Sequence, residues 1–219
     1  MAITILTSSQ KKILNLLAKD KTFSELFYLS GGTALAEYYL HHRISEDLDF
    51  FTPKEIDNIW LITLANKIKK TIGFKKLDLE ESFNRNLIHF TTRGETVKTE
   101  FTYYPFTQIE PETVKNGIRV DSLADIAVNK FFTIYQKPTA RHFIDLYLII
   151  KTNKYHWKEL IKLARIKFDT HIDPIQLGSQ LVKADKIMDL PKMLIKISNE
   201  EWRNYFIEQA KRLKSKLAE

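Results

Sequence analysis

The sequence contains no cysteine, which excludes disulfide bonds and thiolate metal sites. It has only six glycines and six prolines among 219 residues, and this argues against long disordered linkers. No apolar run approaches the roughly 20 residues that span a bilayer. The first residues, MAITILTSSQKK, lack the basic and long apolar regions of a signal peptide. We therefore expect a cytoplasmic protein with no membrane partner.

Two common classes of site are also missing. The six histidines show no H-E-x-x-H spacing, which argues against a zinc site of the protease type. No G-x-x-x-x-G-K-[ST] loop occurs, which argues against a Walker-type NTPase.

Positive charge is concentrated toward the end of the chain. Residues 151–219 contain 15 basic and 9 acidic residues, whereas residues 1–150 contain 19 and 18. This excess favours a surface that faces a polyanion. Helix faces that carry a surplus of solvated lysines explain the same charge, so charge alone does not decide between the two readings.

The first 120 residues mix helical and extended patterns. Apolar periodicity and capping residues predict helices at 8–20, 33–42 and 54–73. Short strands are predicted at 27–30 and 47–52. Three further extended stretches, separated by turn-prone residues, predict an antiparallel meander at 74–82, 86–94 and 96–105.

After residue 120 only helical periodicity remains. Helices are predicted at 121–137, 140–152 and 155–168, and two or three more between 173 and 219, the last at 199–218. The sequence therefore predicts an α+β domain over residues 1–120, with a mixed and largely antiparallel sheet. An all-helical domain is predicted over residues 121–219.

Two aspartates on the strand 47–52 suggest a metal site. Side chains alternate along a strand, so Asp47 and Asp49 point to one face while Leu48 and Phe50 point into the core. Two neighbouring carboxylates repel each other, and a cation relieves that repulsion. Carboxylate oxygens are the ligands that Mg²⁺ prefers, usually with water and substrate phosphates completing its shell.

A glycine pair precedes this strand, in the stretch SGGTALAEYYLHHRISEDLDFF. Gly31 and Gly32 allow the backbone to approach a ligand closely. The helix that follows, with Thr33 near its start, offers free backbone amides to a phosphate. Each pattern alone is common, but the order strand, Gly-Gly, helix and Asp-x-Asp strand is far more specific.

This order resembles the signature of the DNA polymerase β-like nucleotidyltransferase superfamily. The longer form, GGTAL followed by HRISEDLDFF, resembles the AbiEii/AbiGii toxin family of bacterial nucleotidyltransferases. That family contains toxins of toxin–antitoxin and phage-abortive-infection modules. The resemblance implies an α/β nucleotidyltransferase core, followed by a helical region that completes the active site and contacts the acceptor.

The resemblance covers residues 25–150 and implies further site residues. Lys98-Thr99-Glu100 matches the family's second motif, so Glu100 would be a third metal carboxylate. A strand glutamate that simply pairs with Lys98 is the structural alternative. Asp121 and Lys130 match the third motif, and Lys130 would contact the triphosphate as a point charge.

Arg141 and Asp145 match the fourth motif. Asp145 lies in an apolar stretch, where it either pairs with Lys130 or Arg141 or positions substrate or metal. Arg43 and Ser45 match the family's Arg-x-Ser/Thr-x-Asp, and Ser45 either binds phosphate or caps the local turn.

Taken together, the predicted site residues fall into three groups. The catalytic residues are Asp47, Asp49, Lys130 and Asp145. The metal ligands are Asp47, Asp49 and Glu100. The nucleotide-binding residues are Gly31, Gly32, Thr33, Arg43, Ser45, Lys130 and Arg141.

The expected activity is the Mg²⁺-dependent transfer of NMP from an NTP to an acceptor hydroxyl. The resemblance and the basic C-terminal residues favour RNA, at the 3′ end of tRNA, as the acceptor for a monomeric toxin with a cognate antitoxin. Two alternatives stay open. The acceptor is a small hydroxylated molecule such as an aminoglycoside, which requires an acidic acceptor cleft, or the protein is a nucleotide- or RNA-binding module without turnover.

Overall fold

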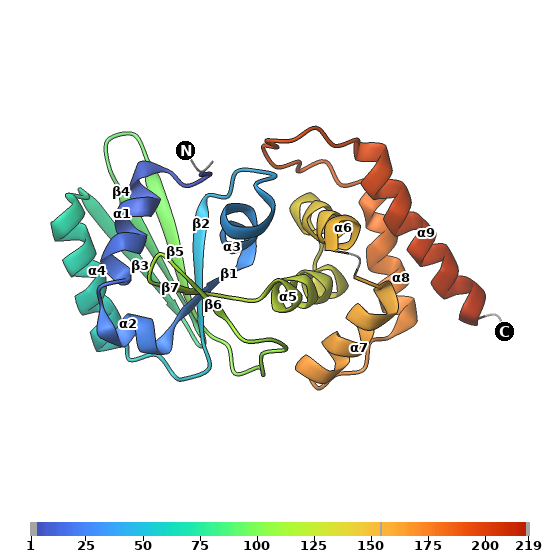
Figure 1. The fold of residues 1–219 in the computed structure, drawn as a ribbon, viewed down its shortest axis with the longest axis horizontal. Coiled ribbons are helices and arrows are strands. Elements are labelled where there is room, and N and C mark those ends of the chain that lie inside the picture. The colour runs from blue at the N-terminus through green and yellow to red at the C-terminus, as the bar shows by residue number, and fades with distance from the viewer. Residues whose placement is uncertain (1–3, 154, 218–219) are drawn as a thin grey trace. The chain divides into compact units, whose positions relative to one another are not determined.

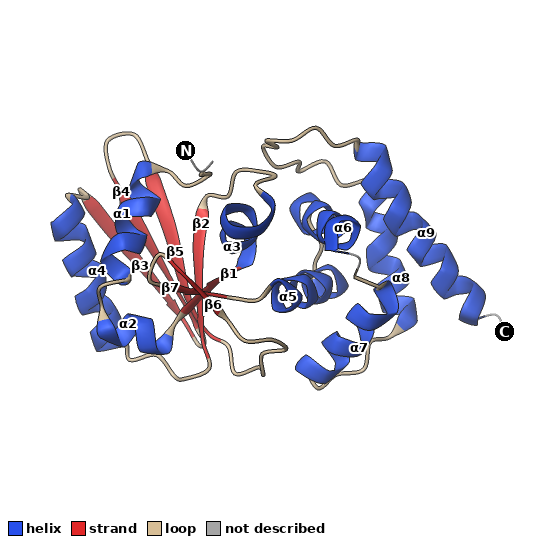
Figure 2. Cartoon of the chain, in the orientation of Figure 1, coloured by secondary structure: helices blue, strands red, loops and turns tan. Residues whose placement is uncertain are grey.

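The computed structural model describes residues 4–153 and 155–217. The chain divides into two compact units, Met1–Ser122 and Leu123–Glu219. The first unit is built on a sheet with helices on both of its faces, and the second is built from helices (Figures 1 and 2). The α+β fold class predicted from the sequence is therefore confirmed.

A mixed sheet of seven strands forms the centre of the N-terminal unit. The strands are β1 (Tyr28–Ser30), β2 (Asp47–Thr52), β3 (Lys76–Ser82), β4 (Arg85–Thr91), β5 (Thr96–Tyr103), β6 (Thr113–Lys115) and β7 (Ile118–Val120). Their order is β3-β4-β5-β2-β1-β7-β6. The predicted antiparallel meander is present as β3, β4 and β5. The β6–β7 hairpin was not predicted, because strands of three residues are too short to show a clear alternation.

Helices cover both faces of this sheet (Figure 1). One face packs against α1 (Ser8–Leu17), α2 (Lys21–Leu26) and α4 (Asn58–Ile72). The opposite face packs against α3 (Gly31–Leu35) and the π-helix η1 (Ala36–Leu40).

An aromatic cluster fills the core of the N-terminal unit. Alternation on β2 buries Leu48 and Phe50 completely. The ring of Phe50 lies 5.0 Å from Phe23 and 5.1 Å from Phe101, measured between centroids. Because one side of β2 is committed to this core, its aspartates must point to the other side.

Several predicted helix boundaries are wrong. The helix predicted at 8–20 ends at Leu17, and Asp20 caps a separate short helix by accepting a hydrogen bond from the Phe23 amide. The helix predicted at 33–42 begins at Gly31 and becomes a π-helix, which ends where His41 enters the left-handed region (φ +48°). Side-chain caps and tertiary packing decide these ends, and the apolar period does not report them.

The helical unit follows the predicted succession of helices. They are α5 (Leu123–Gln136), α6 (Ala140–Asn153), α7 (Trp157–Lys167), α8 (Pro174–Leu181), the 3₁₀ helix η2 (Val182–Asp185) and α9 (Asn199–Leu217). Phe206 on α9 is fully buried, with its ring 4.7 Å from Phe143 and 6.1 Å from Trp157. Among the residues described, no helix is long and apolar enough to cross a membrane.

A buried ion pair joins two helices of this unit. Lys167 Nζ on α7 lies 2.5 Å from Asp125 Oδ1 on α5, and the two side chains are 1% and 0% exposed. Removing one partner of such a pair leaves an uncompensated charge in the interior.

We expect the substitution Lys167→Met to lower the free energy of unfolding by about 3–5 kcal/mol, because Asp125 then loses the ammonium group that contacts it in the interior. Urea unfolding followed by tryptophan fluorescence measures this loss. The double variant Lys167→Met/Asp125→Leu removes both charges and should recover most of the stability. A single variant as stable as the original protein would contradict this account of the pair.

Candidate active site

The pairing of β1 with β2 brings the glycine turn against an aspartate. Ser30, the last residue of β1, lies opposite Asp49 on β2. The chain then turns at Gly31 with φ +70°, a backbone conformation that favours glycine. A Cβ atom at Gly31 would lie 2.3 Å from Asp49 Oδ2. Position 31 therefore requires glycine for its conformation and for space.

The second glycine makes room for an arginine and a serine. A Cβ at Gly32 would lie 2.5 Å from Arg43 Nη2 and 3.0 Å from Ser45 Oγ. Arg43 is 3% exposed, and its Nη1 donates to the main-chain oxygen of Ile44 at 2.9 Å. The structure thus gathers the predicted residues Gly32, Arg43 and Ser45 around one turn.

Thr33 fastens the short helix to the aspartate strand. Its hydroxyl donates to the main-chain oxygen of Asp47, and its side chain is fully buried. This hydrogen bond positions α3 on β2, and the predicted contact of Thr33 with the nucleotide stays a prediction.

Gln10 supports the loop before the aspartates, and the sequence analysis missed it. Its Nε2 donates to the main-chain oxygens of Ser45 and Glu46 at 3.1 and 3.0 Å, and the residue is 1% exposed. Its Oε1 accepts the Thr7 amide in a capping box. The Thr-x-x-Gln spacing could have marked the start of α1, but not this contact across the fold.

Both predicted metal-binding aspartates occupy the face that β2 turns away from the aromatic core. Asp47 and Asp49 are partly exposed, whereas Leu48 between them is buried. Because β2 runs parallel to β5, Asp47 lies beside Lys98 and Asp49 beside Glu100. Lys98 Nζ lies 3.1 Å from Asp47 Oδ2, so the basic residue of the second motif partly neutralises the aspartate pair.

Glu100 shares this face but is held by other groups. Its Oε2 accepts from Arg85 Nη2 at 2.6 Å, and its Oε1 accepts from the Thr102 hydroxyl at 3.0 Å. The alternative prediction that Glu100 pairs with Lys98 is wrong. The strand register places Lys98 opposite Asp47, and these two residues form the ion pair. In the described parts of the chain, no group of three or more His, Cys, Asp or Glu residues is placed to hold a metal ion.

The aspartate pair still fits a magnesium ion. Asp47 and Asp49 supply carboxylate oxygens on one face, and the Asp47 side chain is 26% exposed and can be reached from solvent. Mg²⁺ typically binds through one or two carboxylates and keeps several waters. Two protein ligands are therefore a suitable donor set, and a third is not required.

In the helical unit, the third and fourth motifs meet. Lys130 Nζ on α5 lies 2.8 Å from Asp145 Oδ2 on α6, with side-chain exposures of 10% and 0%. Of the two partners considered for Asp145, this structure thus uses Lys130. Arg141 is exposed in the first turn of α6.

Asp121, which the third motif also includes, belongs to the N-terminal unit and is fully buried. Its Oδ2 accepts from the Ser30 hydroxyl at 2.6 Å. Asp121 therefore fixes the end of β1, from which the glycine turn starts.

Two tyrosines follow the glycine turn on η1. Burial raises the pKa of Tyr38 to about 12, and the neighbouring Glu37 adds to this rise. Burial also raises the pKa of Tyr39, whose hydroxyl donates to the main-chain oxygen of Asp121 at 2.7 Å. Both hydroxyls are therefore protonated and neutral at physiological pH.

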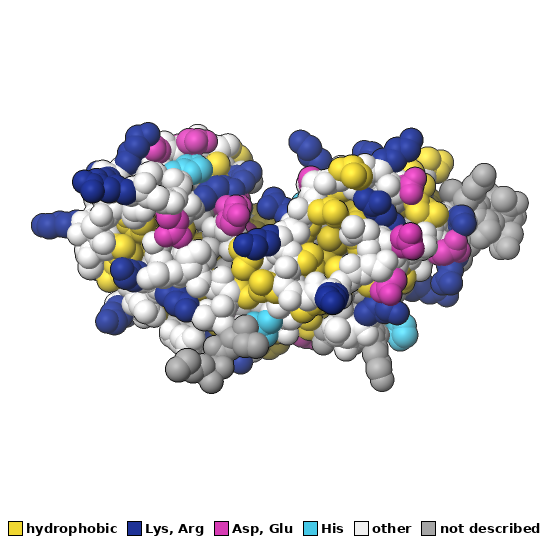
Figure 3. All heavy atoms as spheres, turned by 90° about the horizontal axis from the view of Figure 1, so that it is seen from above, with side chains coloured by type: hydrophobic (Ala, Val, Ile, Leu, Met, Phe, Trp, Pro, Cys, Tyr) yellow, Lys and Arg dark blue, Asp and Glu magenta, His cyan; other side chains and the backbone are white. Residues whose placement is uncertain are grey.

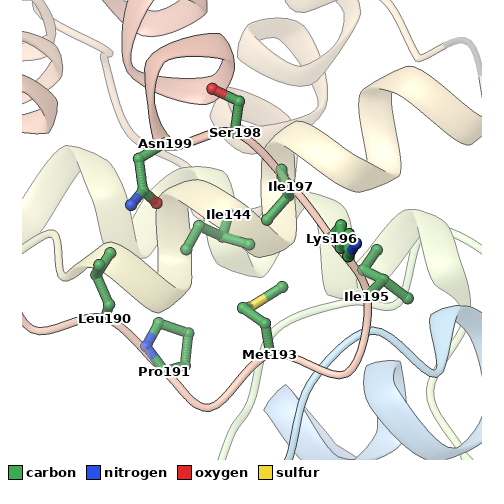
Figure 4. A pocket seen from close by; sticks show the side chains of 9 residues that line it. All are labelled: Ile144, Leu190, Pro191, Met193, Ile195, Lys196, Ile197, Ser198 and Asn199. Carbon is green, nitrogen blue, oxygen red and sulfur yellow. The ribbon is translucent and has the colours of Figure 1, made fainter.

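The helical unit has an apolar hollow of about 450 Å³ whose lining, among the described residues, contains no carboxylate (Figure 4). In it, Ile144 of α6 is surrounded by side chains of the segment 190–199, among them Leu190, Met193 and Ile197. Hydrophobic side chains are also exposed on this unit (Figure 3). Lys196 is the one titratable group among the described residues that line the hollow, so no acid–base pair is available there.

Comparison with known proteins identifies a family. The family described as nucleotidyl transferase AbiEii toxin, type IV TA system, matches residues 15–216. An uncharacterized protein of Aquifex aeolicus (strain VF5) is 30% identical over 146 residues, which are 65% of this chain and 66% of that protein.

Two solved structures share the fold. JHP933 from Helicobacter pylori superposes with a TM-score of 0.57 at 24% identity, covering 96% of this chain and 90% of that one. MenT4, a nucleotidyltransferase toxin from Mycobacterium tuberculosis H37Rv, superposes with a TM-score of 0.58 at 15% identity, covering 94% and 82%. At these identities the likeness concerns the fold.

The family match extends over most of the chain and includes the glycine turn, the aspartate strand and the Lys130–Asp145 pair. It confirms the resemblance noted in the sequence: the chain belongs to the AbiEii nucleotidyl transferase toxin family of type IV toxin–antitoxin systems, and it is a nucleotidyltransferase.

Proposed function

We propose that this nucleotidyltransferase transfers NMP from an NTP to a hydroxyl of RNA, at the 3′ end of tRNA, in a Mg²⁺-dependent reaction. One observation carries the proposal. The glycine turn lies directly against the carboxylate of Asp49, with Arg43 and Ser45 behind it. This arrangement offers a backbone surface for phosphates beside carboxylates for a metal ion.

In the proposed reaction the acceptor hydroxyl oxygen forms a bond to the α-phosphorus. The bond from that phosphorus to the oxygen bridging the β-phosphate breaks, and pyrophosphate leaves with the electron pair, while the hydroxyl proton passes to solvent. Asp47 and Asp49 would hold Mg²⁺, which when bound neutralises charge on the phosphate oxygens and favours the ionised acceptor hydroxyl. The protein contributes mainly position and electrostatics.

Residues of the glycine turn and its neighbours are proposed to bind the triphosphate. The missing Cβ atoms at Gly31 and Gly32 let the carboxylate of Asp49 and the guanidinium of Arg43 lie close to the turn, so a metal-binding group and a cation would stand beside the backbone amides proposed to meet the phosphates. Arg43 supplies a fixed positive charge next to the turn, and its burial keeps the guanidinium in place. Ser45 serves either as a phosphate donor or as a support of the turn.

Lys130 remains the proposed contact to the triphosphate, with Asp145 as the group that orients it. Their separation of 2.8 Å and the full burial of Asp145 support a fixed ammonium position in the helical unit. A point charge of this kind suits the leaving pyrophosphate.

An RNA acceptor is supported by charge. Residues 151–219 carry six more basic than acidic residues. A polyanionic acceptor gains from such a surface, whereas a cationic small molecule such as an aminoglycoside does not. The type IV toxin–antitoxin family also leads us to propose a cognate antitoxin for this monomeric toxin.

We expect incubation with α-labelled NTPs and a mixture of total RNA and protein to place the label on RNA, at tRNA 3′ ends. Gel separation followed by nuclease mapping locates it. The variants Asp47→Asn and Asp49→Asn keep the shape of the side chain but lose its charge, and incorporation should fall by at least about 10²–10³-fold.

Asp78→Asn is the matched control, because it removes an equally charged side chain from the exposed strand β3 and should leave incorporation unchanged. Label on a small molecule would overturn the RNA acceptor. NTP binding with no release of pyrophosphate would indicate a module without turnover.

We further expect Gly31→Ala to lower kcat/KM for the NTP by about 100-fold, the loss typical of reacting groups displaced by about 1 Å. The added methyl group would lie 2.3 Å from Asp49 Oδ2. The alanine would also have to adopt the positive φ of +70°, which is unfavourable for a residue with a Cβ atom. Steady-state release of pyrophosphate measures the effect.

Gly94→Ala provides the control, because a Cβ at Gly94 meets no atom within 4 Å and its φ is not positive. If Gly31→Ala and Gly94→Ala are equally active, the close approach of the turn to Asp49 has no part in catalysis.

A further inference from the structure

One helix of the C-terminal unit has two opposite faces of different character. The side chains of Leu160, Ala164 and Lys167 on α7 are buried. Three other side chains on α7, those of Lys158, Lys162 and Arg165, are exposed. Their spacing of four and three residues puts them on one stripe, and at 100° per residue this stripe lies opposite the buried face.

These three cations are available for a ligand. Within residues 4–153 and 155–217, none of the three forms an ion pair, although Glu159 and Asp169 are exposed nearby in the sequence. An unpaired exposed cation loses little when it binds an anion, because no existing contact has to break.

Two hollows in the surface include residues of this stripe together with further basic side chains. One hollow of about 510 Å³, between α7 and α9, includes Lys158 together with His156 and Arg212. Another of about 530 Å³, at the end of α7, includes Lys162 and Arg165. His171 lines this second hollow, and so does the acidic residue Asp169. We call the set His156, Lys158, Lys162, Arg165, His171 and Arg212 the α7 basic face.

A tryptophan side chain also lines the first hollow. Trp157 lines it, and Trp157 Nε1 is buried without an acceptor among the described residues. Its ring packs on Phe131 and Phe206, with centroids 5.2 and 6.1 Å away, so the indole is held in place. A phosphate that enters this hollow would meet the positive charge of Lys158 and Arg212 beside a rigidly held indole ring.

We propose that the α7 basic face binds the phosphate backbone of the acceptor RNA. This inference rests on the proposed RNA acceptor and assigns it a docking surface apart from the residues that carry the chemistry. From Lys158 to Arg165 the helix rises roughly 10 Å, and a nucleic-acid strand presents one phosphate per about 3.4 Å of helix axis. The stripe therefore matches about three consecutive phosphates. Such contacts position a nucleic acid without reading its sequence.

The test is binding of a fluorescently labelled tRNA, followed by anisotropy over a range of salt concentrations. For the variant Lys158→Gln/Lys162→Gln/Arg165→Gln, we expect weaker binding and a shallower salt dependence. The slope of log K against log salt should fall in magnitude by roughly 2–3, since each lost phosphate contact removes about 0.9.

Lys19→Gln/Lys70→Gln/Lys75→Gln is the matched control, because it removes three exposed positive charges from the N-terminal unit. The control should keep the slope of the original protein. Circular dichroism checks that both variants are folded, and the KM for NTP should be unchanged in both.

The outcomes separate this inference from the proposed function. Equal slopes for the two variants, or no RNA binding by the original protein, would overturn the inference. RNA that binds through this face but receives no label would sustain it and contradict the proposed acceptor. If polyaspartate displaces the RNA as efficiently as an oligonucleotide of equal charge, the face suits an acidic protein, and the RNA assignment is wrong.

Discussion

The candidate site depends on one steric constraint, the contact of a glycine turn with a strand carboxylate. The register of β1 and β2 places Ser30 opposite Asp49, and the next residue must turn where a Cβ would collide with Asp49 Oδ2. Only glycine satisfies both the positive φ and the missing space. The aromatic core on the other side of the sheet fixes which way the aspartates point, so the chemistry and the core are specified by the same strand.

Charge in both units is arranged in pairs that hold functional groups in place. On the sheet, Lys98 partly neutralises Asp47, and this reduces the repulsion within the aspartate pair. In the helical unit, Lys130 and Lys167 each contact a buried aspartate, and either cation would be costly to leave alone in the interior. The exposed cations of α7 differ from these, because they are solvated and form no ion pair among the described residues.

The sequence was sufficient for the features that local rules determine. Alternation on β2 and the glycine pair are local, so the common face of Asp47 and Asp49 and the turn at Gly31 could be predicted before the structure, whereas their roles stay predictions. The partners of Lys98 and Glu100 depend on strand register, and sequence reasoning predicted Glu100 as a metal ligand, with pairing to Lys98 as the alternative, whereas the structure pairs Lys98 with Asp47 and Glu100 with Arg85. Gln10 and the Lys167–Asp125 pair act across 35 or more positions, and no local pattern reports such contacts. The α7 stripe was visible only as an excess of charge until burial showed which lysine points inward.

The central claim is that Asp47 and Asp49 together hold a divalent cation beside the glycine turn. The most direct measurement is anomalous diffraction from crystals grown with Mn²⁺ and a non-hydrolysable NTP analogue. The account predicts an anomalous peak in contact with both carboxylates, with the triphosphate against Gly31 and Gly32, and no such peak in Asp49→Asn crystals. A peak elsewhere, or a triphosphate bound with no metal at these aspartates, would contradict it.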